Sequence, residues 1–175
     1  MRRLMCALFV LLLLPVLFCA AQAETEKKEV FMTAFDTVDL EGNPVDLSLM
    51  DGASFILLNI WEPWCGPCKS EMPDMSELYL KYRDRGLLIV GVSGMTSDFP
   101  VESAAVAEEL QVAYPLVQWQ EGLIPFTIEA FPTSFLYLRK EDGSLKAEGY
   151  MVGMLTGEQW EDLFLQYLPD PADPA

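Results

Sequence analysis

Two cysteines, Cys65 and Cys68, lie three positions apart where a strand-like segment gives way to a helix-like one. Residues 54–61 are rich in β-branched and aromatic side chains, and residues 67–83 carry apolar side chains at helical spacing. The first backbone N–H groups of a helix have no partner inside it, so they would point at Cys65. At such a position in a Cys-X-X-Cys motif, the pKa of the first cysteine falls from about 8.5 to roughly 3.5–7.5. The motif therefore predicts a reactive dithiol, with Cys65 ionised and Cys68 shielded one turn inside the helix.

The N-terminus has the features of a secretory signal peptide over residues 1–23. Two arginines precede an apolar stretch at residues 4–18, and residues 21–23 read Ala-Gln-Ala, which is an Ala-X-Ala cleavage site. We predict export to the periplasm or cell envelope, with a membrane tether if the segment is not cleaved. The apolar stretch is shorter than the roughly 20 residues of a spanning helix. Lipidation at Cys19 is disfavoured, because it would require a small residue at the preceding position, which is Phe18.

Only Cys65 and Cys68 would remain after removal of residues 1–23, because the other two cysteines lie within that segment. A zinc site needs about four N or S ligands, and the exported chain would have neither a histidine nor a third cysteine. A purely structural disulfide over so short a loop would constrain the unfolded chain very little. A redox-active pair is favoured over both. In an oxidising compartment it acts as a reductant only if another protein supplies electrons.

The strongly acidic composition bears on which classes of macromolecule the protein can bind. The chain has 27 acidic and 11 basic residues, with a formal net charge of −16. Nucleic acids and anionic lipid surfaces both attract clusters of Lys and Arg, so neither is expected as a partner. The acidic surface favours solubility and would steer the protein toward partners with basic surfaces. The alternative, a solvated acidic surface with no specific partner, is the favoured interpretation. The exported part has the size of a single domain.

Strand-like and helix-like patterns alternate around the motif, which predicts an α/β fold with a mixed central sheet and helices on both faces. Residues 35–47 alternate apolar and polar side chains around a Gly/Asn turn and predict a β-hairpin. The continuous apolar run at residues 86–92 is typical of a strand covered on both faces. Further strands are expected over residues 114–117, 133–139 and 145–151, and further helices over residues 100–110 and 156–168. The chain divides into the signal peptide, a mobile lead-in over residues 24–34, a domain over residues 35–168 and a disordered tail over residues 169–175.

Together these features resemble the TlpA/ResA-like thiol-disulfide oxidoreductases of the thioredoxin superfamily. The resemblance covers essentially all of residues 35–168. It implies a thioredoxin-like fold with an N-terminal β-hairpin and a central helix–strand insert at about residues 100–118. It is carried by four short segments: Asn59-Ile60-Trp61, Trp64-Cys65-Gly66-Pro67-Cys68-Lys69, Glu71-Met72-Pro73 and Phe131-Pro132-Thr133.

The resemblance implies a role for several matching residues. Cys65 would be the nucleophile that forms a mixed disulfide with the partner, and Cys68 the resolving thiol that releases it. Pro132 would be a cis-proline that faces the dithiol and exposes the preceding backbone for strand-like pairing with substrate. An ordinary trans proline at a strand start is the alternative. The residues expected to line the substrate groove are Trp64, Gly66, Pro67, Phe131 and Thr133.

Glu71 matches an acidic residue that ResA-like proteins use to tune the cysteine pair and to move protons. The alternative for Glu71 is a solvated carboxylate on the helix surface. Asn59 stands where thioredoxin has a buried aspartate, so proton relay from that strand is not expected. This difference favours Glu71 as the residue that moves protons to and from the cysteine pair.

Two positions depart from the family pattern. Glu62 and Pro63 stand where small and polar residues are common, and the carboxylate would add negative charge that opposes thiolate formation at Cys65. Phe131 is bulkier than the usual residue before the cis-proline, so the substrate preference of relatives does not transfer. Neither departure removes a catalytic group.

The resemblance implies an exported enzyme that reduces protein disulfides, because Gly66-Pro67 between the cysteines is shared with reducing thioredoxins. Its partners would be a disulfide-containing client protein and an upstream membrane electron donor. One family client is apocytochrome c, whose cysteines are kept reduced for haem attachment in cytochrome c biogenesis. We expect a monomer with no cofactor other than the redox-active disulfide, no bound metal and no nucleic-acid partner.

Three alternatives stay open. A disulfide oxidase or isomerase of the envelope, resembling DsbA, would use the same dithiol at a higher potential. A peroxidase would share the fold but have a different cysteine motif, which is not found here. In a non-catalytic binding module with the thioredoxin fold, the disulfide would be inert and the acidic face would be the working surface.

Overall fold

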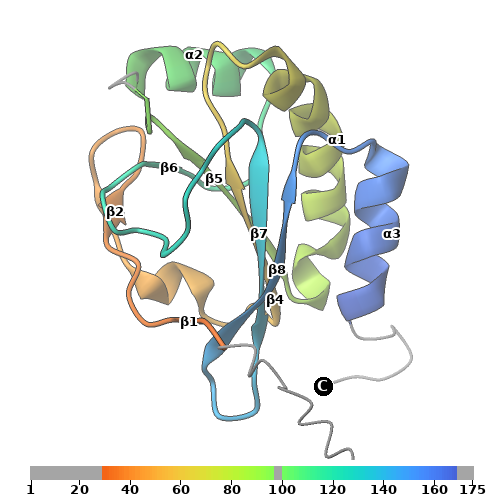
Figure 1. The fold of residues 1–175 in the computed structure, drawn as a ribbon. Helices are drawn as coiled ribbons and strands as arrows, with labels where there is room; N and C mark the ends of the chain where they lie inside the picture. The colour runs from red at the N-terminus through yellow and green to blue at the C-terminus, as the bar shows by residue number, and fades with distance from the viewer. Residues whose placement is uncertain (1–28, 97–99, 169–175) are drawn as a thin grey trace, which may run out of the picture.

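The computed structural model describes residues 29–96 and 100–168, so the expected signal peptide, the first part of the lead-in and the tail lie outside the described residues. The described chain forms a six-stranded sheet in the order β1-β8-β7-β4-β5-β6 (Figure 1). The strands in that order are β1 Phe31–Met32, β8 Leu145–Val152, β7 Thr133–Arg139, β4 Phe55–Ile60, β5 Leu87–Ser93 and β6 Leu116–Gln118. β4 runs parallel to β5 and antiparallel to β7, which makes the sheet mixed, as predicted.

β4 and β5 form the buried centre of the sheet. All six residues of β4 and all seven of β5 are buried, because strands flank them on both sides and other elements cover both faces. Their parallel register runs from Phe55 opposite Leu87 to Ile60 opposite Val92. Parallel strands end at the same edge of a sheet, so the chain that follows β4 and the chain that follows β5 meet there. This edge carries both cysteines and is called the dithiol end.

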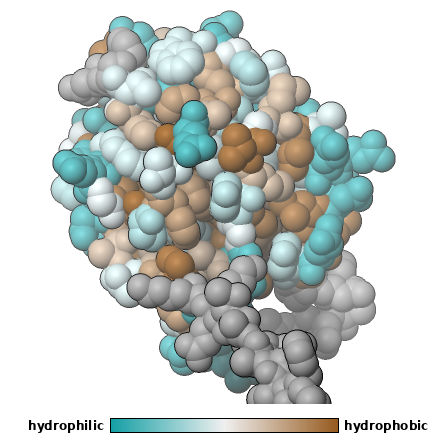
Figure 2. Space-filling model, in the orientation of Figure 1, coloured by the Kyte–Doolittle hydropathy of each residue, from teal (hydrophilic) through white to brown (hydrophobic). Residues whose placement is uncertain are grey.

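Two helices cover one face of the sheet: α1, Gly66–Tyr82, and α3, Gly157–Tyr167 (Figure 1). Their apolar sides pack on the sheet in a core that includes the fully buried Trp160. Strongly hydrophilic side chains gather on the side of the molecule where these helices lie, at the right of Figure 2. The Asp74 carboxylate of α1 accepts a hydrogen bond from the Gly157 N–H at 3.0 Å, which joins the two helices.

The opposite face is covered by short elements and irregular chain. The short elements are the hairpin of β2, Thr37–Val38, and β3, Pro44–Val45, and the 3₁₀ helix η1, Leu47–Met50. Residues 119–131 complete the cover, and Leu123 and Ile124 enter the core there. The predicted hairpin is therefore confirmed. The helical cover expected on this face is limited to η1, because Gly122 and Pro125 disfavour a helix within residues 119–131.

The third α-helix, α2, spans Pro100–Glu109 and lies across the dithiol end (Figure 1). Val106 of α2 and Leu110, which directly follows the helix, pack against a small core that contains Trp61 and Cys68. The helix expected in this region is confirmed. Because its residues pack on this core, α2 lies beside the cysteines, and it also connects β5 to β6.

The lead-in region differs from the expectation in one respect. Phe31 and Met32 form β1, which pairs antiparallel with β8, and the Ala147 N–H donates to the Val30 carbonyl at 2.8 Å. Met32 is buried in the core of the domain. A strand of two residues is too short for an alternating pattern to reveal it, so only the pairing with β8 defines it.

Candidate active site

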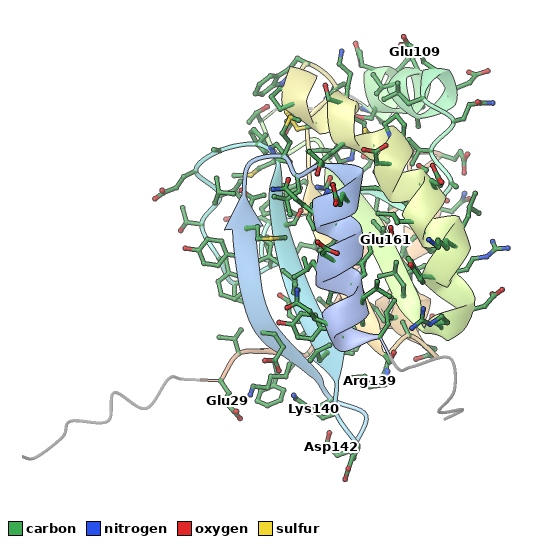
Figure 3. The ribbon with its side chains drawn as sticks, turned by 90° about the vertical axis from the view of Figure 1, so that its right-hand side faces the viewer. Glu29, Glu109, Arg139, Lys140, Asp142 and Glu161 are labelled. Atoms are coloured by element: carbon green, nitrogen blue, oxygen red, sulfur yellow. A yellow bond between two sulfur atoms is a disulfide. The ribbon has the colours of Figure 1, made fainter. Side chains whose placement is uncertain are left out.

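Cys65 and Cys68 form a disulfide at the start of α1, with Cα atoms 5.3 Å apart (Figure 3). Cys65 is the N-cap residue of the helix, and its Sγ accepts a hydrogen bond from the Cys68 N–H at 3.2 Å. Cys65 is 4% exposed, whereas Cys68 is 0% exposed. The reachable sulfur is therefore that of Cys65, and the N–H groups at the helix start would stabilise its thiolate.

The loop before the helix is fixed by its own backbone. The Cys65 N–H donates to the Glu62 carbonyl at 2.9 Å, and the Lys69 N–H donates to the Cys65 carbonyl at 3.2 Å. Pro67 lies in the first turn of the helix, where its missing N–H removes no intrahelical bond. Gly66 begins the helix, and a Cβ at that position would meet nothing within 4 Å. The sequence thus makes a tight turn that leads directly into the helix and holds Cys65 at its N-terminus.

The fold brings a second loop to the dithiol. The Phe131–Pro132 peptide bond is cis, in agreement with the expected cis-proline. Because β7 is antiparallel to β4, Thr133 pairs with Ile60, and the loop before β7 lies beside the loop after β4. The Trp64 and Phe131 rings meet edge to face, with centroids 5.6 Å apart. The two loops therefore share an aromatic surface next to Cys65.

The residues expected to line the substrate groove do not all have the same exposure. Trp64 is 58% exposed, Gly66 and Pro67 are also exposed, and Phe131 is partly buried. Thr133 is 2% exposed, and its hydroxyl donates to the Ala130 carbonyl at 2.8 Å. The Thr133 side chain therefore supports the cis-proline loop from inside, Trp64, Gly66 and Pro67 are exposed, and Phe131 packs partly against the core.

Glu71 is buried one turn beyond Cys68 and is 1% exposed. Its carboxylate accepts hydrogen bonds from Asn59 Nδ2 at 2.9 Å, the Leu155 N–H at 3.1 Å and Trp160 Nε1 at 3.2 Å. Burial raises the pKa of this carboxyl above its ordinary value, and the three hydrogen bonds oppose part of that rise. Glu71 is therefore not a solvated helix carboxylate, and a proton on it is held more tightly than on an exposed glutamate.

The partners of Glu71 are residues that the sequence did not reveal as functional. Leu155 and Trp160 lie 84 and 89 positions further along the chain. Asn59 also donates to the Ser134 hydroxyl at 3.0 Å, across the β4–β7 ladder. Asn59 and Ser134 are polar residues inside otherwise apolar strands, and buried polar groups require hydrogen-bond partners. That pattern is the one feature of the sequence that could have indicated this network.

Glu62 is fully buried, although it lies in the loop just before Cys65. Its Oε1 accepts a hydrogen bond from the Thr96 N–H at 2.9 Å, whereas Oε2 has no hydrogen-bond partner within the described part of the chain. Thr96 follows β5, so Glu62 joins the dithiol loop to the chain that leads from β5 to α2. The sequence identified this carboxylate only as a charge near Cys65, and the structure adds this connection.

The arrangement is suited to attack on a disulfide bond. It combines one reachable sulfur at a helix N-terminus, a second sulfur behind it and a buried carboxyl one turn further on. Within residues 29–96 and 100–168, no group of three or more His, Cys, Asp or Glu side chains is placed to hold a metal ion.

The chain is similar in sequence to known thiol-disulfide oxidoreductases. Residues 29–123 match the model of the AhpC/TSA family. The chain is 30% identical over 148 residues to thiol-disulfide oxidoreductase ResA of Bacillus thuringiensis (strain Al Hakam), covering 83% of this chain and 80% of that protein. It is 34% identical over 165 residues to ResA of Geobacillus thermodenitrificans, covering 90% and 91%.

Solved structures show the same fold. A thiol:disulfide interchange protein of the thioredoxin family from Chlorobium tepidum TLS superposes with a TM-score of 0.67 at 22% identity, over 81% of this chain and 98% of that chain. StoA from Bacillus subtilis superposes with a TM-score of 0.58 at 24% identity, over 76% and 97%. The sheet order, the dithiol at the start of α1 and the sequence similarity agree, and the chain belongs to the AhpC/TSA family and, within it, to the ResA-like thiol-disulfide oxidoreductases with the thioredoxin fold.

Proposed function

We propose that this oxidoreductase reduces disulfides in exported client proteins, with Cys65 as the nucleophile and Cys68 as the resolving thiol. The observation that carries the proposal is the difference between the two sulfurs. Cys65 caps the N-terminus of α1 and is 4% exposed, whereas Cys68 lies one turn inside the helix and is 0% exposed. The helix start favours the thiolate that attacks, and the buried position protects the thiol that acts second.

The reaction proceeds in two exchanges. The Cys65 thiolate attacks one sulfur of the client disulfide, that S–S bond breaks, and the other client sulfur leaves as a thiolate that takes up a proton. Cys68 then loses its proton and attacks the Cys65 sulfur, which releases the second client thiol and forms the Cys65–Cys68 disulfide. Two electrons pass to the client, so an upstream donor with a dithiol must reduce the protein again.

Glu71 supports the second exchange in this proposal. It lies one turn beyond Cys68, and burial raises its pKa, so its carboxylate is a better proton acceptor than an exposed glutamate. We assign it the role of receiving the Cys68 proton during resolution. The backbone next to Pro132 would pair with an extended client segment, with Trp64 and Phe131 at its sides. The chemistry uses the protein's own disulfide and requires no other cofactor.

Export is part of the proposal and rests on the signal-peptide features of residues 1–23. The helices of the described residues are too short or too polar to cross a bilayer. The location that follows is the periplasm or cell envelope, with a membrane tether if the signal segment is retained. Apocytochrome c is one candidate client, and a membrane protein is the candidate electron donor. Fractionation of cells, with the mass of the purified protein, tests both the location and the cleavage after Ala23.

Client trapping tests the roles of the two cysteines. With Cys68→Ala, the mixed disulfide on Cys65 cannot be resolved, so exported client proteins should accumulate as adducts that dithiothreitol releases. The matched control, Cys65→Ala, should yield no adducts. Adducts on both variants, or on neither, would contradict the assignment of Cys65 as the nucleophile.

The alternative of an oxidase or isomerase uses the same residues with the opposite direction of electron flow. Gly66-Pro67 between the cysteines, shared with reducing thioredoxins, supports reduction. The reduction potential of the pair distinguishes the two directions, because reducing thioredoxins lie near −270 mV and DsbA near −120 mV.

A further inference from the structure

A groove of about 400 Å³ lies between the dithiol loop and α2. Its lining is apolar except for one carboxylate and consists of Pro63, Trp64, Glu102, Ala105 and Val106. Two of the lining residues, Pro63 and Trp64, directly precede Cys65 in the chain, and Trp64 is 58% exposed. We name this space the α2 groove. A client segment attached to Cys65 would have neighbouring residues within reach of it.

The charged residues on the groove side of α2 are both acidic. Glu102 and Glu109 lie seven positions apart on α2, which places them on the same side of the helix as Ala105 and Val106. Both carboxylates are exposed, and neither forms an ion pair with another described residue.

Few cations lie near α2 in the sequence, and the one beside the dithiol is Lys69, which follows Cys68 and forms no ion pair with another described residue. No Lys or Arg occurs between Arg85 and Arg139, a stretch that contains α2, β6 and the cis-proline loop. Figure 3 shows Arg139 and Lys140 at the opposite end of the molecule from Glu109. Two lysines at that far end already have carboxylate partners, since Lys140 pairs with Glu148 at 2.9 Å and Lys146 with Glu29 at 2.6 Å. The carboxylates of Glu102 and Glu109 are therefore not neutralised by an ion pair within the described part of the chain.

We propose that the α2 groove binds a cationic client segment, in which a Lys or Arg lies close to the cysteine that is attacked. The methylene stem of that residue would lie on Trp64 and Val106, and its charged group would pair with Glu102. This inference rests on the proposed function, because it names the class of client that the same dithiol reduces. The occupant is an extended, disulfide-bearing segment with net positive charge.

The chemistry of the lining supports this occupant. Lys and Arg bury their apolar stems against apolar surface and keep the charge at the rim, and an aromatic face such as that of Trp64 also attracts a cation. A purely apolar occupant would leave Glu102 without a charged partner, and an acidic one would be repelled. Because rim charges act on encounter and docking, the effect should appear in kcat/KM and weaken with salt.

Three synthetic peptides provide the test. They have the same length and one disulfide each, and they differ only in the residues beside the cysteines, which are Lys, Gln or Glu. We expect the purified protein, kept reduced by dithiothreitol, to reduce the Lys peptide with a kcat/KM about three- to tenfold above that of the Glu peptide at low salt. The preference should largely disappear near 1 M salt, where the screening length is about 3 Å.

Substitutions in α2 test whether the preference for the Lys peptide over the Glu peptide comes from the α2 groove. The double variant Glu102→Gln with Glu109→Gln should lose most of the preference, and Glu102→Lys should reverse its direction. The matched control, Glu77→Gln with Glu141→Gln, removes two exposed charges from α1 and the β7–β8 turn and should retain the preference. Reduction potential and thermal unfolding are measured for each variant, so that a change in peptide preference is separated from a change in the dithiol itself or in folding.

The outcomes separate this inference from the proposed function. Equal kcat/KM for all three peptides, or equal losses in the groove variant and its control, would overturn the α2 groove as a cation-selective site while leaving disulfide reduction intact. Failure to reduce any of the peptides would overturn the proposed reduction itself, and the groove assignment with it.

Discussion

Asn59 Nδ2 lies 2.9 Å from Glu71 Oε1, so the central strand β4 is hydrogen-bonded directly to the helix that begins with the dithiol. The same carboxylate accepts a bond from Trp160 of α3 at 3.2 Å. One buried acid thus joins the strand and the two helices that position the cysteines. Its protonation state affects both the packing of these elements and the chemistry one turn away.

The first prediction concerns stability against pH. Burial raises the pKa of Glu71 above its ordinary value, so the folded state binds this proton more tightly than the unfolded state does. The associated stability is present below the unfolded pKa and is lost as pH rises through the folded pKa. Glu71→Gln should remove this loss, which thermal unfolding of both proteins across that pH range would show. A parallel pH dependence in the two proteins would contradict it.

The amide introduced by Glu71→Gln can be accommodated by rotation of one neighbour. Asn59 Oδ1 has no hydrogen-bond partner within the described part of the chain. If the Asn59 amide turns over, its Oδ1 can accept bonds from the introduced NH₂ group and from the Ser134 hydroxyl. The introduced amide oxygen can then still accept from Leu155 and Trp160. We therefore expect Glu71→Gln to fold, so that a change in its activity reports proton transfer.

The second prediction concerns the kinetics of Glu71→Gln. If Glu71 receives the Cys68 proton, the variant should form the mixed disulfide at the normal rate but resolve it more slowly, by roughly 10-fold or more. Rapid mixing with a disulfide peptide, followed by acid quench and mass spectrometry, separates the two steps. Equal slowing of both steps would instead indicate a general structural defect.

The third prediction concerns Trp160. Trp160→Phe keeps an aromatic ring beside Phe164, whose centroid lies 5.7 Å from that of Trp160, but removes the donor to Glu71. The loss should cost about 1–3 kcal/mol in the free energy of unfolding and raise the pKa of Glu71 further. A double-mutant cycle with Glu71→Leu, which removes the acceptor that Glu71→Gln would keep, should give a coupling energy above about 0.5 kcal/mol when measured by urea unfolding. Strict additivity would show that the bond makes no net contribution.

The fourth prediction concerns Glu62, which anchors the Thr96 N–H at 2.9 Å. Glu62→Gln retains an oxygen acceptor for Thr96, whereas Glu62→Ala leaves that N–H without its partner and opens space in a fully buried position. We expect the Ala variant to lose about 1–3 kcal/mol of unfolding free energy and the Gln variant to lose much less. Equal losses would show that the hydrogen bond to Thr96 is not the important contact.

The fifth prediction tests the peroxidase alternative. The only cysteines in the described residues are Cys65 and Cys68, at the start of α1 in a Cys-X-X-Cys motif, which is not the local motif of a peroxidatic cysteine. The reduced protein should therefore consume hydrogen peroxide no faster than an equal concentration of a small dithiol. Rapid, saturable consumption would favour the peroxidase alternative.

Much of the site follows from local sequence. Gly66 and Pro67 define the turn into α1, and the apolar run before Cys65 defines β4, because each signal lies within a few residues of the feature it determines. The surroundings of Glu71 do not follow in this way, since Leu155 and Trp160 reach it only after the sheet has folded.

The same distinction explains two other differences. β1 consists of two residues, Phe31 and Met32, whose conformation depends on pairing with β8. Glu62 is a charged residue in a loop, yet it is fully buried and accepts a hydrogen bond from the Thr96 N–H, 34 positions further along the chain. In both places the deciding contacts come from distant parts of the chain.

The most direct test of the central claim is the reduction potential of the Cys65–Cys68 pair. The purified protein is equilibrated against glutathione or dithiothreitol buffers, and the fluorescence of Trp64, adjacent to Cys65, reports the redox state. A dedicated reductant should have a potential at or below about −200 mV. A value near −120 mV would mean that the protein installs disulfides and that electrons flow in the opposite direction.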